Sequence, residues 1–136
     1  MRTVDDIFAG TKPPGVTCTR AFAGLPESVS AARAWVAGFV PGSPAATDAA
    51  LMTSELFTNA ILYSASGLPG GQVTVSVRTA DGAIRVDVVD QGAVPPPAAA
   101  PCGLGKGLAI VSALADVFGA DGTDRWFWLR TQDGAR

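Results

Sequence analysis

Three short segments of the sequence combine residue types that can bind a nucleotide and a metal ion. In the first, Glu55 and Asn59 lie four residues apart in a stretch with helical periodicity, so their side chains share one face of the predicted helix. That face is otherwise apolar, and an unpaired carboxylate and amide on it would cost roughly several kcal/mol. Mg²⁺ prefers oxygen ligands and accepts an Asn carbonyl together with phosphates and waters. The alternative, which the pair alone favours, is the polar edge of an amphipathic surface helix.

The second segment is Asp90-Gln91-Gly92, which follows a predicted strand rich in Val and Ile. A carboxylate only accepts hydrogen bonds, so at the end of a strand it suits an exocyclic amine such as that of adenine. The glycine beside it allows the backbone to turn away from the strand. An ordinary turn aspartate is the alternative interpretation, and the segment by itself favours it.

The third segment is Gly103-Leu104-Gly105-Lys106-Gly107, at the start of a stretch with helical periodicity. Glycines let backbone N–H groups approach an anion, and the N-terminus of a helix adds a favourable dipole. Lys106 adds a positive charge. The segment is not a P-loop, because Gly107 follows Lys106 where that motif requires Ser or Thr. Phosphate binding and a plain glycine-rich turn remain equally open for this segment alone.

The hydrophobic pattern predicts the elements that must position these residues. Strands are expected at 16–24, 72–79, 83–90 and 125–130, and helices at about 26–40, 44–64 and 104–118. The dipeptide Asp81-Gly82 predicts a hairpin between the two middle strands. Residues 91–102 are rich in proline, which excludes a regular helix or an inner strand there. The order predicts an α/β fold, a two-layer α/β sandwich with a mixed β-sheet and helices on one face.

Length and composition limit the class of protein. The chain has 136 residues, a net charge of −2 and no histidine. The length suits one domain, expected at 16–136 after a flexible N-terminal tail at 1–15. The acidic balance argues against direct nucleic-acid binding, and the lack of histidine excludes Ser-His-Asp catalysis and a phospho-accepting histidine. No stretch approaches the roughly 20 apolar residues that span a bilayer, and Asp5 and Asp6 without a following apolar run lead us to expect no signal peptide. We therefore expect a cytoplasmic protein without membrane contact.

The order and spacing of the three segments are far more specific than any one of them. Glu55 to Ala60, Asp90 to Gly92 and Gly105 to Leu108 together resemble the nucleotide-binding boxes of the histidine-kinase-like (Bergerat fold) ATPases. Within that superfamily the chain is most similar to the small bacterial anti-sigma factor serine/threonine kinases. The resemblance extends from about Phe22 to Leu129, which is nearly the whole chain.

The resemblance implies ATP and Mg²⁺ as cofactors and assigns roles to individual residues. Asn59 matches the magnesium-binding Asn of the family, and Glu55 matches the acid proposed as general base. Asp90 matches the Asp that binds the adenine amine, with Gly92 beside it. The proline-rich segment matches the lid over ATP. The positions expected at the phosphates are Gly103, Gly105, Lys106, Gly107 and Leu108.

The sequence also departs from the family pattern. Tyr63 stands where many relatives have His, and residues 91–104 contain no charged side chain. Lys106 is the only local substitute for a missing γ-phosphate ligand. These departures affect phosphoryl transfer, which depends on charge stabilisation, more than nucleotide binding.

The resemblance implies an ATP-binding anti-sigma factor with two protein partners. It would sequester a sigma factor and phosphorylate a Ser or Thr of an anti-anti-sigma protein, and close relatives are often homodimers. Arg33, in the first helix, falls where such kinases place an Arg that contacts partners. One alternative is a non-catalytic nucleotide-binding interaction module with the same fold. Another is a fragment of a sensor kinase, which would need a His-bearing helix upstream.

Overall fold

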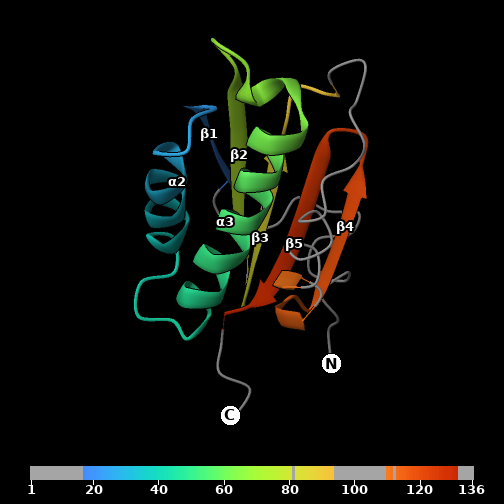
Figure 1. Cartoon of the computed structure of the whole chain (residues 1–136). Coiled ribbons are helices and arrows are strands. Elements are labelled where there is room, and N and C mark those ends of the chain that lie inside the picture. The colour runs from blue at the N-terminus through green and yellow to red at the C-terminus, as the bar shows by residue number, and fades with distance from the viewer. Residues whose placement is uncertain (1–16, 81, 94–109, 112, 132–136) are drawn as a thin grey trace.

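The protein has two layers, a β-sheet and a pair of helices that cover one of its faces (Figure 1). The computed structural model describes residues 17–80, 82–93, 110–111 and 113–131. Within these residues no helix has the length and apolar character that crossing a bilayer requires. The elements are β1 (Thr17–Ala23), α2 (Ser28–Ala37), α3 (Ala45–Tyr63), the 3₁₀ turn η1 (Ala65–Gly67), β2 (Gln72–Ala80), β3 (Ala83–Val89), β4 (Val117–Asp121) and β5 (Asp124–Arg130).

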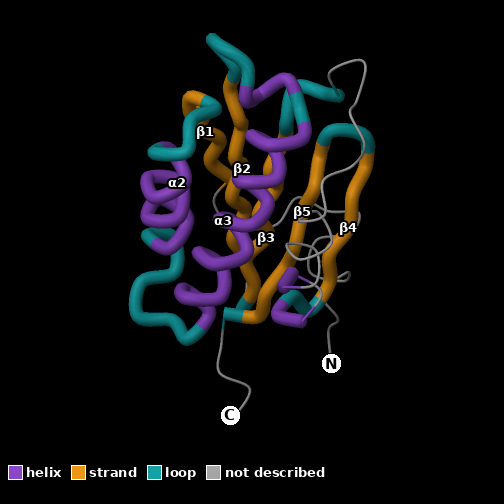
Figure 2. Tube along the Cα trace, in the orientation of Figure 1, coloured by secondary structure: helices purple, strands orange, loops and turns teal. Residues whose placement is uncertain are grey.

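The strands follow the order β1-β2-β3-β5-β4, and every neighbouring pair is antiparallel. Two pairs are hairpins whose turns contain Gly82 and Gly122, with φ angles of 68° and 60° that favour glycine. The chain runs along α2 and returns along α3 before it enters β2, so β1 and β2 are also antiparallel (Figure 2). The two-layer α/β fold with helices on one face is confirmed, but the sheet is antiparallel rather than mixed.

The core forms where α3 packs on the middle of the sheet. On β2, Val73, Val75 and Val77 alternate with partly exposed residues and are fully buried. From α3, Met52 and Phe57 are fully buried against them. Each such side chain contributes about 1.5–3 kcal/mol when it leaves water, so these contacts fix the position of α3 on the sheet.

Helix α2 packs beside α3 through the apolar positions that the sequence predicts. Ala32 and Val36 are buried. The Trp35 ring makes edge-to-face contacts with Phe22 at 5.8 Å and with Phe39 at 5.0 Å between ring centroids. Gly38 ends the helix at its C-cap, so the predicted helix at 26–40 is confirmed with slightly shorter ends.

The C-terminal end of the helix predicted at 104–118 is wrong. Residues 110–111 and 113–114 are helical, but Val117 and Phe118 are the first residues of β4. Branched and aromatic side chains favour strands, and the Asp121-Gly122 turn returns the chain into β5. That dipeptide is a hairpin signal that was available in the sequence and was not used. Residues 104–109 of the predicted helix lie outside the described part of the chain.

Candidate functional site

The polar residues predicted on α3 are placed on one side of the helix. Glu55 and Asn59 are one turn apart, and both are half-buried. The neighbouring residues Leu56, Phe57 and Ala60 are buried in the core, which fixes the helix in this orientation. The Nδ2 atom of Asn59 is buried and has no hydrogen-bond partner in the part of the chain that the structure describes. A buried amide without a partner is unfavourable, so Asn59 is suited to bind a ligand.

Asp90 lies directly after β3, and hydrogen bonds fix its backbone and side chain. Its N–H donates to the carbonyl of Thr123 at 3.0 Å, which ties it to the β4–β5 turn. Its Oδ1 accepts from the N–H of Gly92 at 2.8 Å. Gly92 has a φ of 89°, a conformation that other residues rarely adopt, so the glycine permits this short turn. One oxygen of the Asp90 carboxylate is therefore engaged by its own loop.

The Asp90–Gly92 loop is also bound to the turn that follows α3. The Ala65 N–H donates to the Gly92 carbonyl at 2.7 Å, and the Gln91 N–H donates to Ser66 Oγ at 3.0 Å. Gln91 Oε1 accepts from the Gln72 N–H at 2.8 Å. These bonds connect the end of α3 to the end of β3, so they set where Asn59 lies relative to the loop.

Asn59 and Asp90, which the sequence assigns to metal and adenine, line the same pocket together with Ala60, Tyr63 and Arg125. The sequence did not predict Arg125. Its Nη1 donates to Asp90 Oδ2 at 3.0 Å, which forms an ion pair. The alternation of β5 contained a signal, because Arg125 is on the same face as the core residues Phe127 and Leu129. A charge on the inward face of a strand needs a partner.

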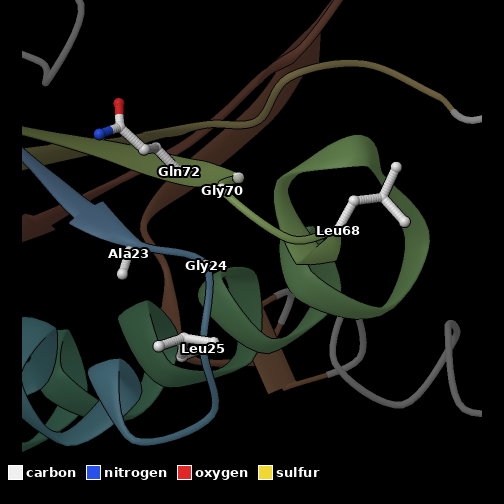
Figure 3. Close-up of a pocket in the computed structure, with 7 residues that line it drawn as sticks. Ala23, Gly24, Leu25, Leu68, Gly70 and Gln72 are labelled. Carbon is white, nitrogen blue, oxygen red and sulfur yellow. The ribbon is translucent and has the colours of Figure 1, made fainter.

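The pocket is small, with a volume of about 30 Å³. A larger hollow of about 310 Å³ lies at the ends of β1 and β2 and is lined by Ala23, Gly24, Leu25, Leu68, Gly70, Gly71 and Gln72 (Figure 3). It has no charged side chain, and none of the residues predicted to bind the nucleotide lines it. Its size alone does not make it the functional site, since the residues predicted to bind metal and adenine line the smaller pocket.

The other predicted site residues either lie apart from this pocket or fall outside the described residues. Arg33 is exposed on α2, away from the Asn59–Asp90 pocket. The glycine-rich positions Gly103 to Leu108 and residues 94–102 of the proline-rich segment lie outside the described residues. The structure therefore brings together the predicted metal and adenine positions, and it places Glu55 on the same helix as Asn59.

A second charged cluster lies on the face of the sheet opposite the helices. Arg85 and Asp87 alternate along β3 with core residues, so they point away from α3. Arg85 donates from Nε to Oδ1 of Asp87 at 2.8 Å and from Nη2 to Oδ2 at 2.9 Å. Its guanidinium carbon also lies 4.4 Å from the centre of the Trp126 ring. The hydrogen bond to Asp87 raises the pKa of Arg85.

Asp124 on β5 completes this outer cluster. Burial, and then the hydrogen bond and charge of Asp87, raise the pKa of Asp124 to about 7. Burial also acts to raise the pKa of Asp87, but hydrogen bonds from Arg85 and Asp124 lower it on balance. Oδ1 of Asp124 is buried and has no hydrogen-bond partner in the described parts of the chain, which disfavours the ionised form. At pH values below about 7 the cluster therefore favours a protonated Asp124 beside an ionised Asp87.

Comparison with known proteins agrees with this fold. Residues 22–130 match the family described as the histidine kinase-like ATPase domain. The chain belongs to this family, which confirms the resemblance seen in the sequence, and an ATPase domain implies ATP as the nucleotide. The chain is also similar to a protein of Geobacillus stearothermophilus named Anti-sigma F factor, with 36% identity over 75 residues. That match covers 52% of this chain and 51% of the relative, so it spans about half the length of each.

Proposed function

We propose that this protein is an ATP-binding anti-sigma factor that sequesters a sigma factor and phosphorylates a Ser or Thr of an anti-anti-sigma protein. The observation that carries the proposal is the shared pocket of Asn59 and Asp90 within a histidine kinase-like ATPase domain. The similarity to Anti-sigma F factor supports the role in regulating transcription.

Asn59 is the residue that would hold Mg²⁺. Its side chain lines the pocket, and its buried Nδ2 lacks a partner among the described residues. Rotation of the amide by half a turn exchanges its nitrogen and oxygen, so no existing bond prevents Asn59 from presenting its oxygen. Mg²⁺ in nucleotide sites takes one or two protein oxygens and completes its shell with phosphates and waters, and a single amide ligand fits that pattern. The ion would neutralise charge on the phosphates.

Glu55 would act as the general base, since a carboxylate can accept a proton and the Asn59 amide cannot. The hydroxyl oxygen of the partner's Ser or Thr forms a bond to the γ-phosphorus of ATP. The bond between that phosphorus and the bridging oxygen breaks, ADP leaves, and the hydroxyl proton passes to Glu55. Most of the remaining acceleration comes from positioning and from charge stabilisation around the phosphates.

A non-catalytic nucleotide-binding interaction module is the second candidate. Residues 91–104 contain no charged side chain, so this part of the chain offers no ligand for the developing charge on the γ-phosphate. Under this alternative ATP would regulate partner binding without being consumed.

The proposed function is tested by single-turnover transfer of labelled phosphate from ATP to a purified anti-anti-sigma partner. We expect Glu55→Gln to bind ATP nearly as well as the wild type but to transfer phosphate at least about 100-fold more slowly. Asn59→Ala should bind ATP more weakly than the wild type in the presence of Mg²⁺. When EDTA removes the Mg²⁺, the affinities of the two proteins should become nearly equal. No transfer by the wild type, with normal Mg·ATP binding, would favour the non-catalytic module.

Arg33 is proposed to contact a protein partner. It is exposed on α2, next to residues that also face solvent, and arginine is enriched at the centres of interfaces. We expect Arg33→Ala to weaken sigma or anti-anti-sigma binding by about 1–3 kcal/mol without altering ATP affinity. Biolayer interferometry with each partner, beside calorimetry with ATP, measures both quantities. Unchanged affinity for both partners would remove Arg33 from the interface.

A further inference from the structure

Both oxygens of the Asp90 carboxylate are already engaged in this structure. Oδ1 accepts from the Gly92 N–H at 2.8 Å, a bond within the loop that any ligand would leave in place. Oδ2 is the oxygen left for a ligand, and Arg125 Nη1 donates to it at 3.0 Å. An exocyclic amine needs an acceptor at this position, and the Arg125 guanidinium, which lines the same pocket, lies beside the oxygen that the base of a nucleotide would use.

The volume of the pocket leads to the same conclusion by an independent route. Its volume of roughly 30 Å³ is far below the volume of about 300 Å³ or more that small-molecule pockets usually have. A purine therefore requires the pocket to open. Among the five lining residues, Asn59, Ala60 and Tyr63 belong to α3, which the core holds in place. Asp90 is fixed by its loop bonds.

Arg125 is the lining residue that can move at small cost. Its side chain is 37% exposed, while that of Asp90 is 11% exposed. One hydrogen bond is recorded between it and Asp90, and a long arginine side chain can turn toward solvent while its backbone stays in β5. Because the guanidinium itself reaches solvent, pairing with Asp90 contributes about 1 kcal/mol or less to holding Arg125 in place, so a ligand can displace it.

We propose that Arg125 closes the base subsite in the nucleotide-free protein and that the base of ATP binds by taking over Oδ2 of Asp90 from it. Arg125 is thus a residue that sets the affinity of the site by competing with the base. This inference rests on the proposed nucleotide site at Asp90 and Asn59, and it adds an occupant within the chain that must leave.

Adenosine is the appropriate probe, because it has the base and sugar but no phosphate that Arg125 could attract. We expect Arg125→Met, which keeps a long unbranched side chain without the guanidinium, to bind adenosine about two- to fivefold more tightly than the wild type. Arg125→Gln should also bind more tightly, by a smaller factor, since its amide can still donate to Asp90. Titrations followed by NMR measure these affinities, and thermal melts check that each variant is folded.

Arg85→Met is the matched control, since it removes the guanidinium from the other arginine–aspartate pair on the far face of the sheet. It should leave adenosine affinity unchanged. Equal or weaker adenosine binding by both Arg125 variants, with Asp90-dependent binding of ATP by the wild type, would overturn the inference and leave the nucleotide site standing. Failure of the wild type and of every Arg125 variant to bind adenosine or ATP would overturn both this inference and the proposed nucleotide site. Binding by the Arg125 variants alone would support both.

Discussion

Two arginine–aspartate pairs lie on opposite faces of the sheet. Arg85 and Asp87 are both on β3, whereas Arg125 is on β5 and its partner Asp90 follows β3. Arg85 holds Asp87 with two hydrogen bonds and stacks on Trp126. Arg125 reaches Asp90 through a hydrogen bond from Nη1, and its side chain is 37% exposed against 20% for Arg85.

The difference separates a structural pair from a displaceable one. Arg85 is fixed by fork-to-fork geometry and by the ring beneath it, so it stabilises the pairing of β3 with β5. Arg125 lies in the pocket with Asn59, whose buried amide nitrogen has no partner among the described residues. An aspartate in a ligand site needs a partner that can leave, and the weaker pair is the one beside the unsatisfied amide.

Loss of the outer pair should have the largest effect on stability. Asp87→Ala leaves the Arg85 guanidinium half-buried without its carboxylate and removes the acceptor beside Asp124, so we expect a loss of about 2–3 kcal/mol in the free energy of unfolding. Urea denaturation measures this change. The ATP affinity of the folded variant should stay at the wild-type value. A loss of ATP binding would show that the outer pair is not purely structural.

The outer cluster should also make stability depend on pH. The pKa of Asp124 is about 7 in the folded protein against 3.8 for an ordinary Asp, so the protonated form favours folding. Its contribution is fully present below the unfolded pKa and is lost as the pH rises through about 7. Allowing for partial exposure, we expect the wild type to lose about 1 kcal/mol between pH 5 and pH 8.

The variant Asp124→Asn should remove most of this loss, because the amide donates to Asp87 at every pH. Urea denaturation at several pH values compares the two proteins. Asp87 remains ionised throughout this range, since its pKa is lowered, so it adds no slope. A variant with the same pH dependence as the wild type would show that another group is responsible.

The smallest effect on stability is expected at the inner pair. Arg125→Met should change the free energy of unfolding by less than about 0.5–1 kcal/mol, because a half-exposed pair contributes little. The same substitution at Arg85 should cost clearly more. Parallel urea titrations of the two methionine variants compare them directly, and equal losses would remove the basis for calling one pair displaceable.

The sequence predicts the layers of this fold well because the buried positions follow regular periods. Alternating valines on β2 and the helical spacing of Ala32 and Val36 each point to one core. The strand β4 was missed because its residues continue an apolar stretch that also fits a helix. The Asp121-Gly122 turn signal is the local feature that favours a hairpin there, and pairing with β5 then fixes Val117 and Phe118 as strand residues.

Only part of the candidate site could be predicted from the sequence. The chemistry of Asn59 and Asp90 drew attention to them, but only the family resemblance favoured a nucleotide site over a polar helix edge and an ordinary turn aspartate. The structure places both at one pocket. Arg125 is not part of the resembled motif, and the sequence separates it from Asp90 by 34 intervening residues. Its role follows from the register of β5 with β3, which places Arg125 opposite Val88, two residues before Asp90, so that its side chain reaches the Asp90 carboxylate.

Calorimetric titration of the wild type and of Asp90→Asn with Mg·ATP tests the central claim most directly. The asparagine can present a donor toward the adenine amine where the aspartate presents only acceptors, so we expect binding to weaken by about 1–3 kcal/mol, which is roughly 5- to 150-fold. Arg125→Met is the control, since it also breaks the ion pair yet should not weaken ATP binding. Wild-type affinity for ATP in Asp90→Asn, or equal affinity of the wild type for ATP and GTP, would contradict the assignment of this pocket to adenine.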